Sequence, residues 1–123
     1  MSKSAFTVKA FGIYVLVVGL GLVCVPHLLL PILGFAPSSE IWIRVVGLLA
    51  FNIGIYYWYA AKSEARAFFM ATVFTRVLVP VVFIVFVVLG LASSALIPFG
   101  AADFAGAAWT FLALRSERPG AGA

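Results

Sequence analysis

The chain has 123 residues, of which 65% are hydrophobic and only 10% are charged. A soluble domain of ordinary composition carries about a quarter charged residues, so this composition excludes a soluble globular protein and indicates an integral membrane protein. Lysine and arginine outnumber aspartate and glutamate by eight to four. That excess would suggest nucleic-acid binding in a soluble chain, but membrane topology explains it here without a nucleic-acid partner.

Four stretches are long and apolar enough to cross a bilayer, which takes about 20 largely apolar residues. The expected spans are residues 10–30, 41–61, 67–91 and 96–114. They predict an all-α membrane protein, a four-helix transmembrane bundle that forms a single domain over residues 1–115. Residues 116–123 are rich in proline and glycine, and we expect them to form a disordered cytoplasmic tail.

The basic residues predict the orientation, because lysine and arginine concentrate in the cytoplasmic loops of membrane proteins. Six of them lie before the first span, between the second and third, or after the fourth: Lys3, Lys9, Lys62, Arg66, Arg115 and Arg118. The loops on the other side carry no lysine or arginine. Both termini are therefore expected to be cytoplasmic.

Polar side chains from three different spans are expected at one depth in the membrane. Counted from the cytoplasmic ends of their helices at about 1.5 Å per residue, Asn52, Arg76 and Asp103 all lie roughly 15–18 Å into the bilayer, near its middle. Arg44 lies about 12 Å further out by the same rise. A charge at the bilayer centre costs roughly 2.5–3.5 kcal/mol on insertion scales. Arg76 and Asp103 are therefore predicted to pair, with Asn52 as a third hydrogen-bonding member.

Two interpretations of this polar cluster stay open. Intramembrane ionisable residues are functional candidates by default, so the cluster is either a ligand or ion site or only a device that fixes helix register. Arg44 has an alternative of its own, an ion pair with Glu40 one turn away at the outer interface. Pro80 lacks an N–H and leaves the carbonyl of Arg76 without its helical donor, so we expect the third helix to kink there.

No catalytic or metal-binding motif accompanies the cluster. The chain has one histidine and one cysteine, too few for a haem ligand pair or a closed zinc site. It contains no glycine-rich phosphate loop, G-x-S-x-G, H-E-x-x-H or C-x-x-C. The sequence predicts a protein without enzymatic activity of its own, without a metal and without a resident cofactor.

Three stretches carry a resemblance to a known family: RVVGLLAFNIGIYYWYAA, ATVFTRVLVPVVF and PFGAADFAGAAWTFLALR. They resemble the small four-helix membrane proteins of the DoxX-like group, including the BphX-like branch found in aromatic-degradation clusters. The matching positions are Arg44-x-x-Gly47, Arg76, and Asp103 with Trp109, and the match covers nearly the whole chain in length and span order. The resemblance implies a multi-pass protein of the bacterial cytoplasmic (inner) membrane, accessory to a redox or catabolic system, and implies no catalytic residue.

The function expected from these observations is a polar intramembrane pocket that binds a small amphipathic ligand, either a quinone or a lipid, or an accessory subunit of a membrane complex. Arg76 and Arg44 would hold an anionic or carbonyl oxygen of the ligand. Asp103 would set the charge on Arg76, and Asn52 would orient the ligand. The expected partners are membrane lipid and either another protein or a second copy of this chain.

Two alternative functions stay open. One is a small proton- or cation-coupled transporter that uses Asp103, and the other is a purely structural subunit. Small multidrug-resistance transporters have a similar length and four spans, but their coupling rests on a glutamate in the first span. Here the first span contains no acidic residue, which weakens the transporter interpretation.

Overall fold

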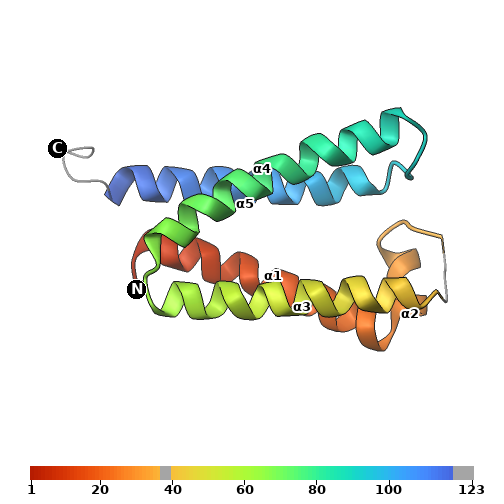
Figure 1. Cartoon of the computed structure of the whole chain (residues 1–123), viewed down its shortest axis with the longest axis horizontal. Coiled ribbons are helices and arrows are strands. Elements are labelled where there is room, and N and C mark those ends of the chain that lie inside the picture. Colours follow the sequence, from red (N-terminus) through yellow and green to blue (C-terminus); the bar gives the residue numbers. More distant parts are fainter. Residues whose placement is uncertain (37–39, 118–123) are drawn as a thin grey trace. The chain divides into compact units, whose positions relative to one another are not determined.

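The computed structural model describes residues 1–36 and 40–117, whose regular secondary structure is α-helical throughout (Figure 1). The helices are α1 (Lys3–Cys24), α2 (Pro26–Ile32), α3 (Ile41–Lys62), α4 (Arg66–Val88) and α5 (Leu96–Glu117). By length and composition, every helix except α2 can cross a membrane, which makes four candidate spans. The predicted fold class, an all-α membrane protein with four transmembrane helices, is confirmed.

The first span differs from the single helix expected over residues 10–30, because two helices cover this region. Helix α1 begins at Lys3, where the Ser2 hydroxyl accepts a hydrogen bond from the Ala5 N–H and so caps the first turn. It ends at Cys24, since Pro26 has no N–H to continue the helical ladder and disfavours helical geometry in Val25. A new short helix, α2, then starts with Pro26 in its first turn.

The ends of α4 and α5 also differ from the expected spans. Helix α4 stops at Val88, three residues before the predicted end, because Gly90 adopts a left-handed conformation (φ 75°). The N–H groups of Gly90 and Leu91 donate back to the carbonyls of Val87 and Phe86, the hydrogen-bond pattern of a Schellman C-cap. Helix α5 continues through Ser116 and Glu117, which were expected in the disordered tail. The rest of that tail, with Arg118, lies outside the described residues.

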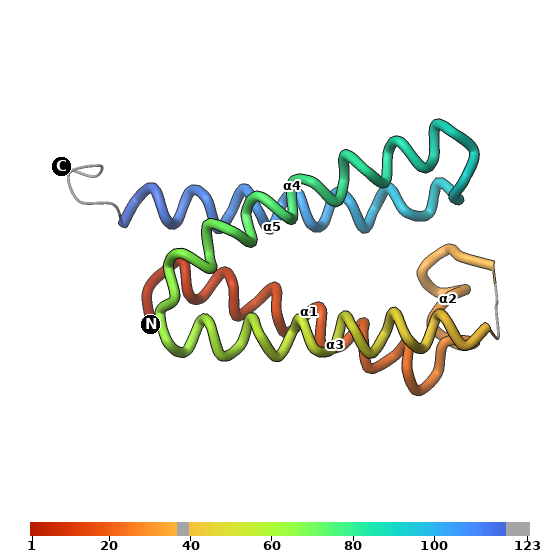
Figure 2. The backbone as a smooth tube through the Cα atoms, in the orientation of Figure 1, coloured from red at the N-terminus to blue at the C-terminus, as the bar shows by residue number. Residues whose placement is uncertain are grey.

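The chain divides into two compact units. The first unit joins residues 1–8 with residues 60–123, so it contains the first turns of α1 together with α4 and α5. Within it, α4 and α5 run alongside each other (Figure 2). The second unit comprises residues 9–59, which contribute the rest of α1, α2 and most of α3.

In the second unit, α1 and α3 approach each other closely at glycines. Gly12 of α1 faces Gly54 of α3, and Gly19 of α1 faces Gly47 of α3. The two glycines on each helix are seven residues apart. A Cβ atom added at Gly19 would lie 2.5 Å from the backbone nitrogen of Phe51 and 2.7 Å from the carbonyl oxygen of Gly47. Such contact between backbones lets helices pack without polar side chains, as is common in membrane proteins.

In the first unit, the seam between α4 and α5 has a similar close contact at Gly100. A Cβ atom there would lie 3.0 Å from the Cα atom of Pro80. Helix α4 runs through Pro80 without a break in its helical residues, and the kink expected at this proline stays a prediction. The glycine brings α5 against the proline-containing turn of α4, one turn beyond Arg76.

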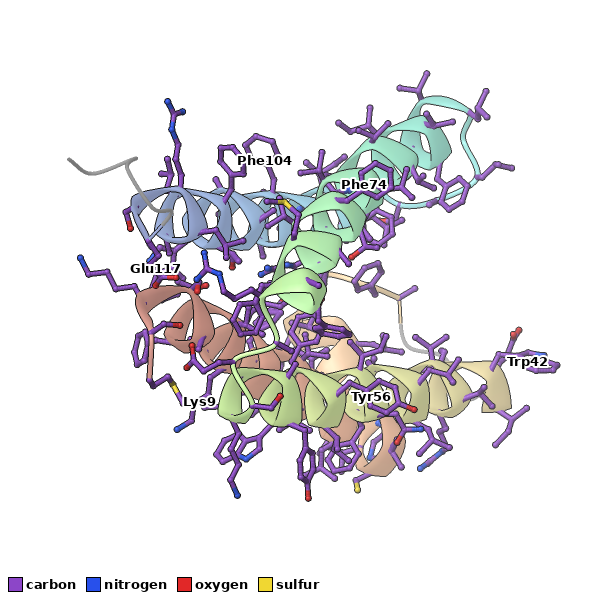
Figure 3. The ribbon with its side chains drawn as sticks, turned by 60° about the vertical axis from the view of Figure 1, so that its left-hand side comes forward. Lys9, Trp42, Tyr56, Phe74, Phe104 and Glu117 are labelled. Carbon is purple, nitrogen blue, oxygen red and sulfur yellow. The ribbon has the colours of Figure 1, made fainter. Side chains whose placement is uncertain are left out.

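Large apolar side chains cover the outside of the helices. Trp42, Tyr56, Phe74 and Phe104 are labelled examples with exposed fractions of 68%, 61%, 72% and 56% (Figure 3). Exposed apolar surface on this scale is unusual for a monomeric soluble protein, whereas in a bilayer these side chains contact acyl chains. Their exposure agrees with the membrane assignment.

The glycine contact between α1 and α3 gives a direct test of packing. We expect Gly19→Ala to destabilise the protein by about 1–3 kcal/mol, because the added methyl group meets backbone atoms that can move only if the helices separate. The matched control is Gly21→Ala on the same helix, where the nearest atom is the end of the flexible Leu29 side chain. Unfolding by sodium dodecyl sulfate in mixed micelles, followed by circular dichroism, measures both. Equal stabilities would contradict a close backbone contact.

Candidate functional site

Arg76 of α4 lies inside the first unit with only 2% of its surface exposed. Its Nε atom donates to the carbonyl of Thr72 at 3.1 Å, and its Nη2 atom donates to the Thr72 hydroxyl at 2.9 Å. The same Nη2 atom also donates to the hydroxyl of Thr110 on α5 at 2.9 Å. These bonds orient the guanidinium from its own helix toward α5, and uncharged oxygen atoms accept from its Nε and Nη2 atoms.

The hydrogen-bond network continues from Thr110 to the first turns of α1. The hydroxyls of Thr110 and Thr7 lie 2.7 Å apart, and both residues are almost completely buried. Thr7 donates its only hydroxyl proton to the carbonyl of Ser4, so Thr110 must be the donor in its contact with Thr7. Donation therefore runs in one direction, from Arg76 through Thr110 and Thr7 to Ser4.

Ser4 in turn belongs to a polar junction near the ends of the helices. The Glu117 carboxylate accepts from the Ser4 N–H at 2.7 Å and from the Ser4 hydroxyl at 2.6 Å. It also forms an ion pair with Arg66 at 2.7 Å. One carboxylate at the end of α5 thereby joins the start of α1 to the start of α4 (Figure 3).

A second contact ties the start of the chain to the turn between α3 and α4. The Ser2 N–H donates to the Glu64 carboxylate at 3.1 Å. The hydrogen bonds from Ser2 hold the pKa of the Glu64 carboxyl below its ordinary value, because they favour the ionised form. The first turn of α1, the α3–α4 turn and the end of α5 thus lie together, as expected for segments on one side of the membrane.

Asp103 lies on α5 in the same unit and is half-buried. Arg76, predicted to pair with it, belongs to the same unit. The Nε and Nη2 atoms of that guanidinium donate to Thr72 and Thr110. A direct or water-bridged pair between Arg76 and Asp103 stays a prediction.

Asn52 and Arg44 belong to the second unit, so their membership in one cluster with Arg76 also stays a prediction. Asn52 is half-buried on α3. Arg44 is exposed, and its Nη1 atom donates to the carbonyl of Val23. That carbonyl is among the last four of α1, which have no donor within their own helix. Arg44 therefore caps the end of α1 from α3, a role the sequence did not predict, and its proposed pairing with Glu40 stays a prediction.

The threonines and the glutamate of this network were not predicted as site residues, although the sequence carries a signal for them. Asp103, Thr110 and Glu117 recur every seven residues, which places them along one face of α5. Ser4 and Thr7 have helical spacing as well, but they lie before the expected start of the first span at residue 10. Because the helix begins at Lys3, these hydroxyls become part of a transmembrane segment.

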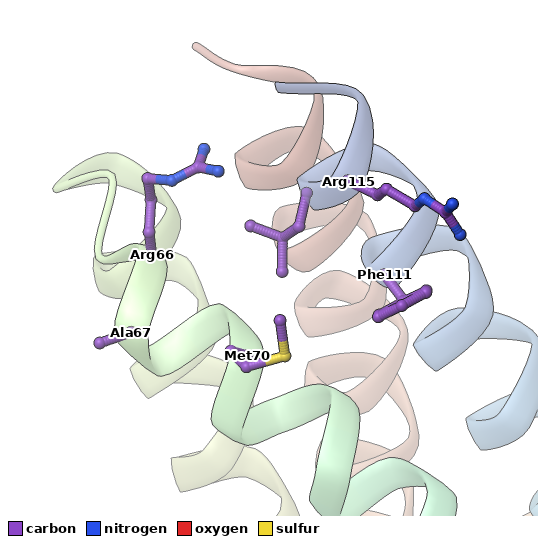
Figure 4. A pocket seen from close by; sticks show the side chains of 6 residues that line it. Arg66, Ala67, Met70, Phe111 and Arg115 are labelled. Atoms are coloured by element: carbon purple, nitrogen blue, oxygen red, sulfur yellow. The ribbon is translucent and has the colours of Figure 1, made fainter. Parts of the chain in front are cut away.

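Two cavities lie along the seam between α4 and α5 in the first unit. One has a volume of about 440 Å³. Its lining is apolar: Val77, Pro80, Val81, Phe83, Ile84, Ile97, Gly100, Ala101 and Phe104. The other measures about 410 Å³ and lies nearer the Glu117 junction (Figure 4). It is lined by Arg66, Ala67, Met70, Phe111, Leu114 and Arg115.

Comparison with known proteins finds no matching family model, curated protein or solved structure. The fold and composition define the class, a multi-pass α-helical membrane protein.

The role of Thr110 in the network can be tested by removing its hydroxyl. We expect Thr110→Val to destabilise the protein by about 1–3 kcal/mol, because Arg76 loses a buried acceptor and Thr7 loses a donor while the side-chain volume is kept. The control is Thr75→Val, which removes an exposed hydroxyl that bonds only to its own helix. Both are measured by unfolding in mixed micelles. A loss no larger for Thr110 than for Thr75 would show that the network adds nothing to stability.

Proposed function

We propose that this chain is a membrane protein without enzymatic activity of its own that binds a small amphipathic molecule of the lipid or quinone class. The observation that carries the proposal is the apolar cavity of about 440 Å³ between α4 and α5. Ligand pockets in proteins typically measure about 300–1,000 Å³ and have mostly apolar walls with a few polar groups. This cavity has the volume and the walls that an isoprenoid or acyl chain requires.

A charged group next to the cavity wall supplies the polar end of the proposed site. Asp103 precedes the lining residue Phe104 and lies three residues after Gly100, another lining residue. It is half-buried, whereas Arg76 is 2% exposed and bonded to two threonines. We therefore assign the contact with the ligand to Asp103, which would accept a hydrogen bond from a hydroxyl or amine. Arg76 would act as a fixed positive charge in the same unit.

This assignment changes the roles expected from the sequence. Arg76 was expected to hold an oxygen of the ligand directly, which stays a prediction; its Nε and Nη2 atoms donate to Thr72 and Thr110. Arg44 was expected to assist, but it is bonded to the Val23 carbonyl. The proposed ligand accordingly donates a hydrogen bond at its polar end, as a quinol or a glycerol hydroxyl does.

The resemblance to DoxX-like proteins extends the proposal to the cellular setting. It favours the cytoplasmic membrane of a bacterium and a role as accessory subunit to a redox or catabolic complex. A lipid-soluble redox carrier such as a quinol would fit both this setting and the cavity. The half-buried Asp103 beside a buried arginine also supports the second candidate, a proton-coupled transporter, which would require Asp103 to change its protonation during transport.

Filling the cavity tests the proposed function. We expect Ala101→Trp to remove a small molecule that co-purifies with the wild-type protein, because the indole would occupy the volume between α4 and α5. Mass spectrometry of organic extracts from the purified proteins measures this. The matched control is Ala105→Trp, one turn further along α5 at an exposed position that does not line the cavity. Identical extracts from the wild type and both variants would contradict a ligand in this cavity.

Substitution of Asp103 distinguishes the two proposed functions, ligand binding and proton-coupled transport. If the protein only binds its ligand, Asp103→Asn weakens binding and the effect does not depend on a proton gradient. If the protein is a transporter, Asp103→Asn abolishes pH-driven movement of the ligand into proteoliposomes. Transport measured with and without an imposed pH gradient distinguishes them.

The proposed orientation is tested by cysteine labelling in intact cells. In a Cys24→Ser background, Ser93→Cys lies in the turn between α4 and α5, and Ser63→Cys lies in the turn between α3 and α4. Because the positive-inside rule places only the first of these turns outside, a membrane-impermeant maleimide is expected to label position 93 and not position 63. The reverse pattern would overturn the cytoplasmic assignment of both termini.

A further inference from the structure

The second cavity on the α4–α5 seam has a different chemistry from the first. Arg66 and Arg115 lie at one end of it, and Met70 and Phe111 lie further along the two helices (Figure 4). Leu114, which is only 6% exposed, is the most buried of its lining residues. The cavity therefore combines two arginines at one end, of which Arg66 is paired with Glu117, with an apolar body in a volume of about 410 Å³.

The positive charges belong to the side of the molecule that the positive-inside rule predicts to face the cytoplasm. Arg66 begins α4 and Arg115 lies in the last turn of α5, both on the side expected to face the cytoplasm. The cytoplasmic leaflet carries negatively charged headgroups, and basic residues near its surface are attracted to them. Charge, depth and an apolar groove that leads toward the membrane centre all match the shape of one lipid molecule.

The acidic residue of this region does not cancel the charge at Arg115. Glu117 is two residues away, and residues at this spacing point to different sides of a helix. Its carboxylate accepts from Ser4 and Arg66 instead. Arg66 is thus partly neutralised, whereas the Arg115 side chain is exposed at the cavity edge.

We infer that this cavity binds an anionic phospholipid of the cytoplasmic leaflet. The phosphate of the headgroup lies between Arg66 and Arg115, and an acyl chain follows the groove over Met70 and Phe111. The two cavities share no lining residue, so this site does not depend on the proposed function of the other cavity. A lipid here would bridge α4 and α5 at the end where Glu117 joins them to α1.

The test measures how well the purified protein retains defined lipids. The protein in detergent is titrated with dioleoylphosphatidylglycerol or dioleoylphosphatidylcholine, and bound lipid is counted by native mass spectrometry. The wild type is expected to retain the anionic lipid in preference to the zwitterionic one. Arg115→Gln is expected to weaken retention of the anionic lipid about fivefold, because the headgroup phosphate loses its direct hydrogen bond with this guanidinium.

Two further variants separate this site from general attraction to negative charge. Lys62→Gln removes an exposed positive charge from the same side of the molecule but outside the cavity, and it is expected to leave retention close to that of the wild type. Ala67→Trp fills the groove without changing any charge, and it is expected to weaken retention as well. Arg66 is left in place because its loss would also break the ion pair with Glu117.

Three results would overturn the inference. Equal retention of the two lipids would show that the headgroup charge is not recognised. Equal weakening by Arg115→Gln and Lys62→Gln would show a diffuse electrostatic effect without a site. Complete displacement of the lipid by millimolar inorganic phosphate would show that the cavity holds only the anion and not the acyl chain.

Discussion

The buried guanidinium of Arg76 imposes the constraint on which the first unit depends. A positive charge removed from water must find hydrogen-bond acceptors, because each polar group left unsatisfied in an apolar interior is costly. For the Nε and Nη2 atoms the chain supplies hydroxyls and a carbonyl, from Thr72 on the same helix and Thr110 on the neighbouring one. Since Thr110 also bonds to Thr7, the need of one side chain on α4 determines how α5 and the first turns of α1 are held together.

In the second unit, α1 and α3 pack against each other at glycines and not around a buried charge. Four glycines allow the backbones of α1 and α3 to touch, so that close packing and not polar contact holds the helices together. A polar contact in this unit, from Arg44 to the Val23 carbonyl, lies at the end of a helix where free carbonyls need a donor. One chain thus uses a hydrogen-bonded core at one place and a glycine seam at another.

On α5, the polar side chains that hold the helices together and the side chains that line the two cavities lie on different faces. Its polar residues Asp103, Thr110 and Glu117 repeat every seven residues along one face, while the residues that line the two cavities occupy an adjoining face. The polar face can therefore hold the helices in register while the adjoining groove stays open to membrane molecules. Asp103 directly precedes Phe104, which lines the apolar cavity, and for this reason the proposed ligand contact is assigned to it.

The sequence by itself determined the all-α class, the four spans and the identity of Arg76 as a residue that needs partners, because hydropathy and charge act locally along the chain. Counting residues along the predicted spans also gave Asp103 the same expected depth as Arg76. The sequence did not reveal the hydroxyl partners of Arg76. A threonine in an apolar helix becomes recognisable as an acceptor only when a neighbouring helix brings a donor close to it, as Arg76 is brought to 2.9 Å from Thr110. Nor did it place Ser4 and Thr7 in a helix, because a serine cap and a distant glutamate stabilise that first turn. Only the tertiary structure decided these partners, because hydrogen bonds between helices depend on rotation and register, which hydropathy does not encode.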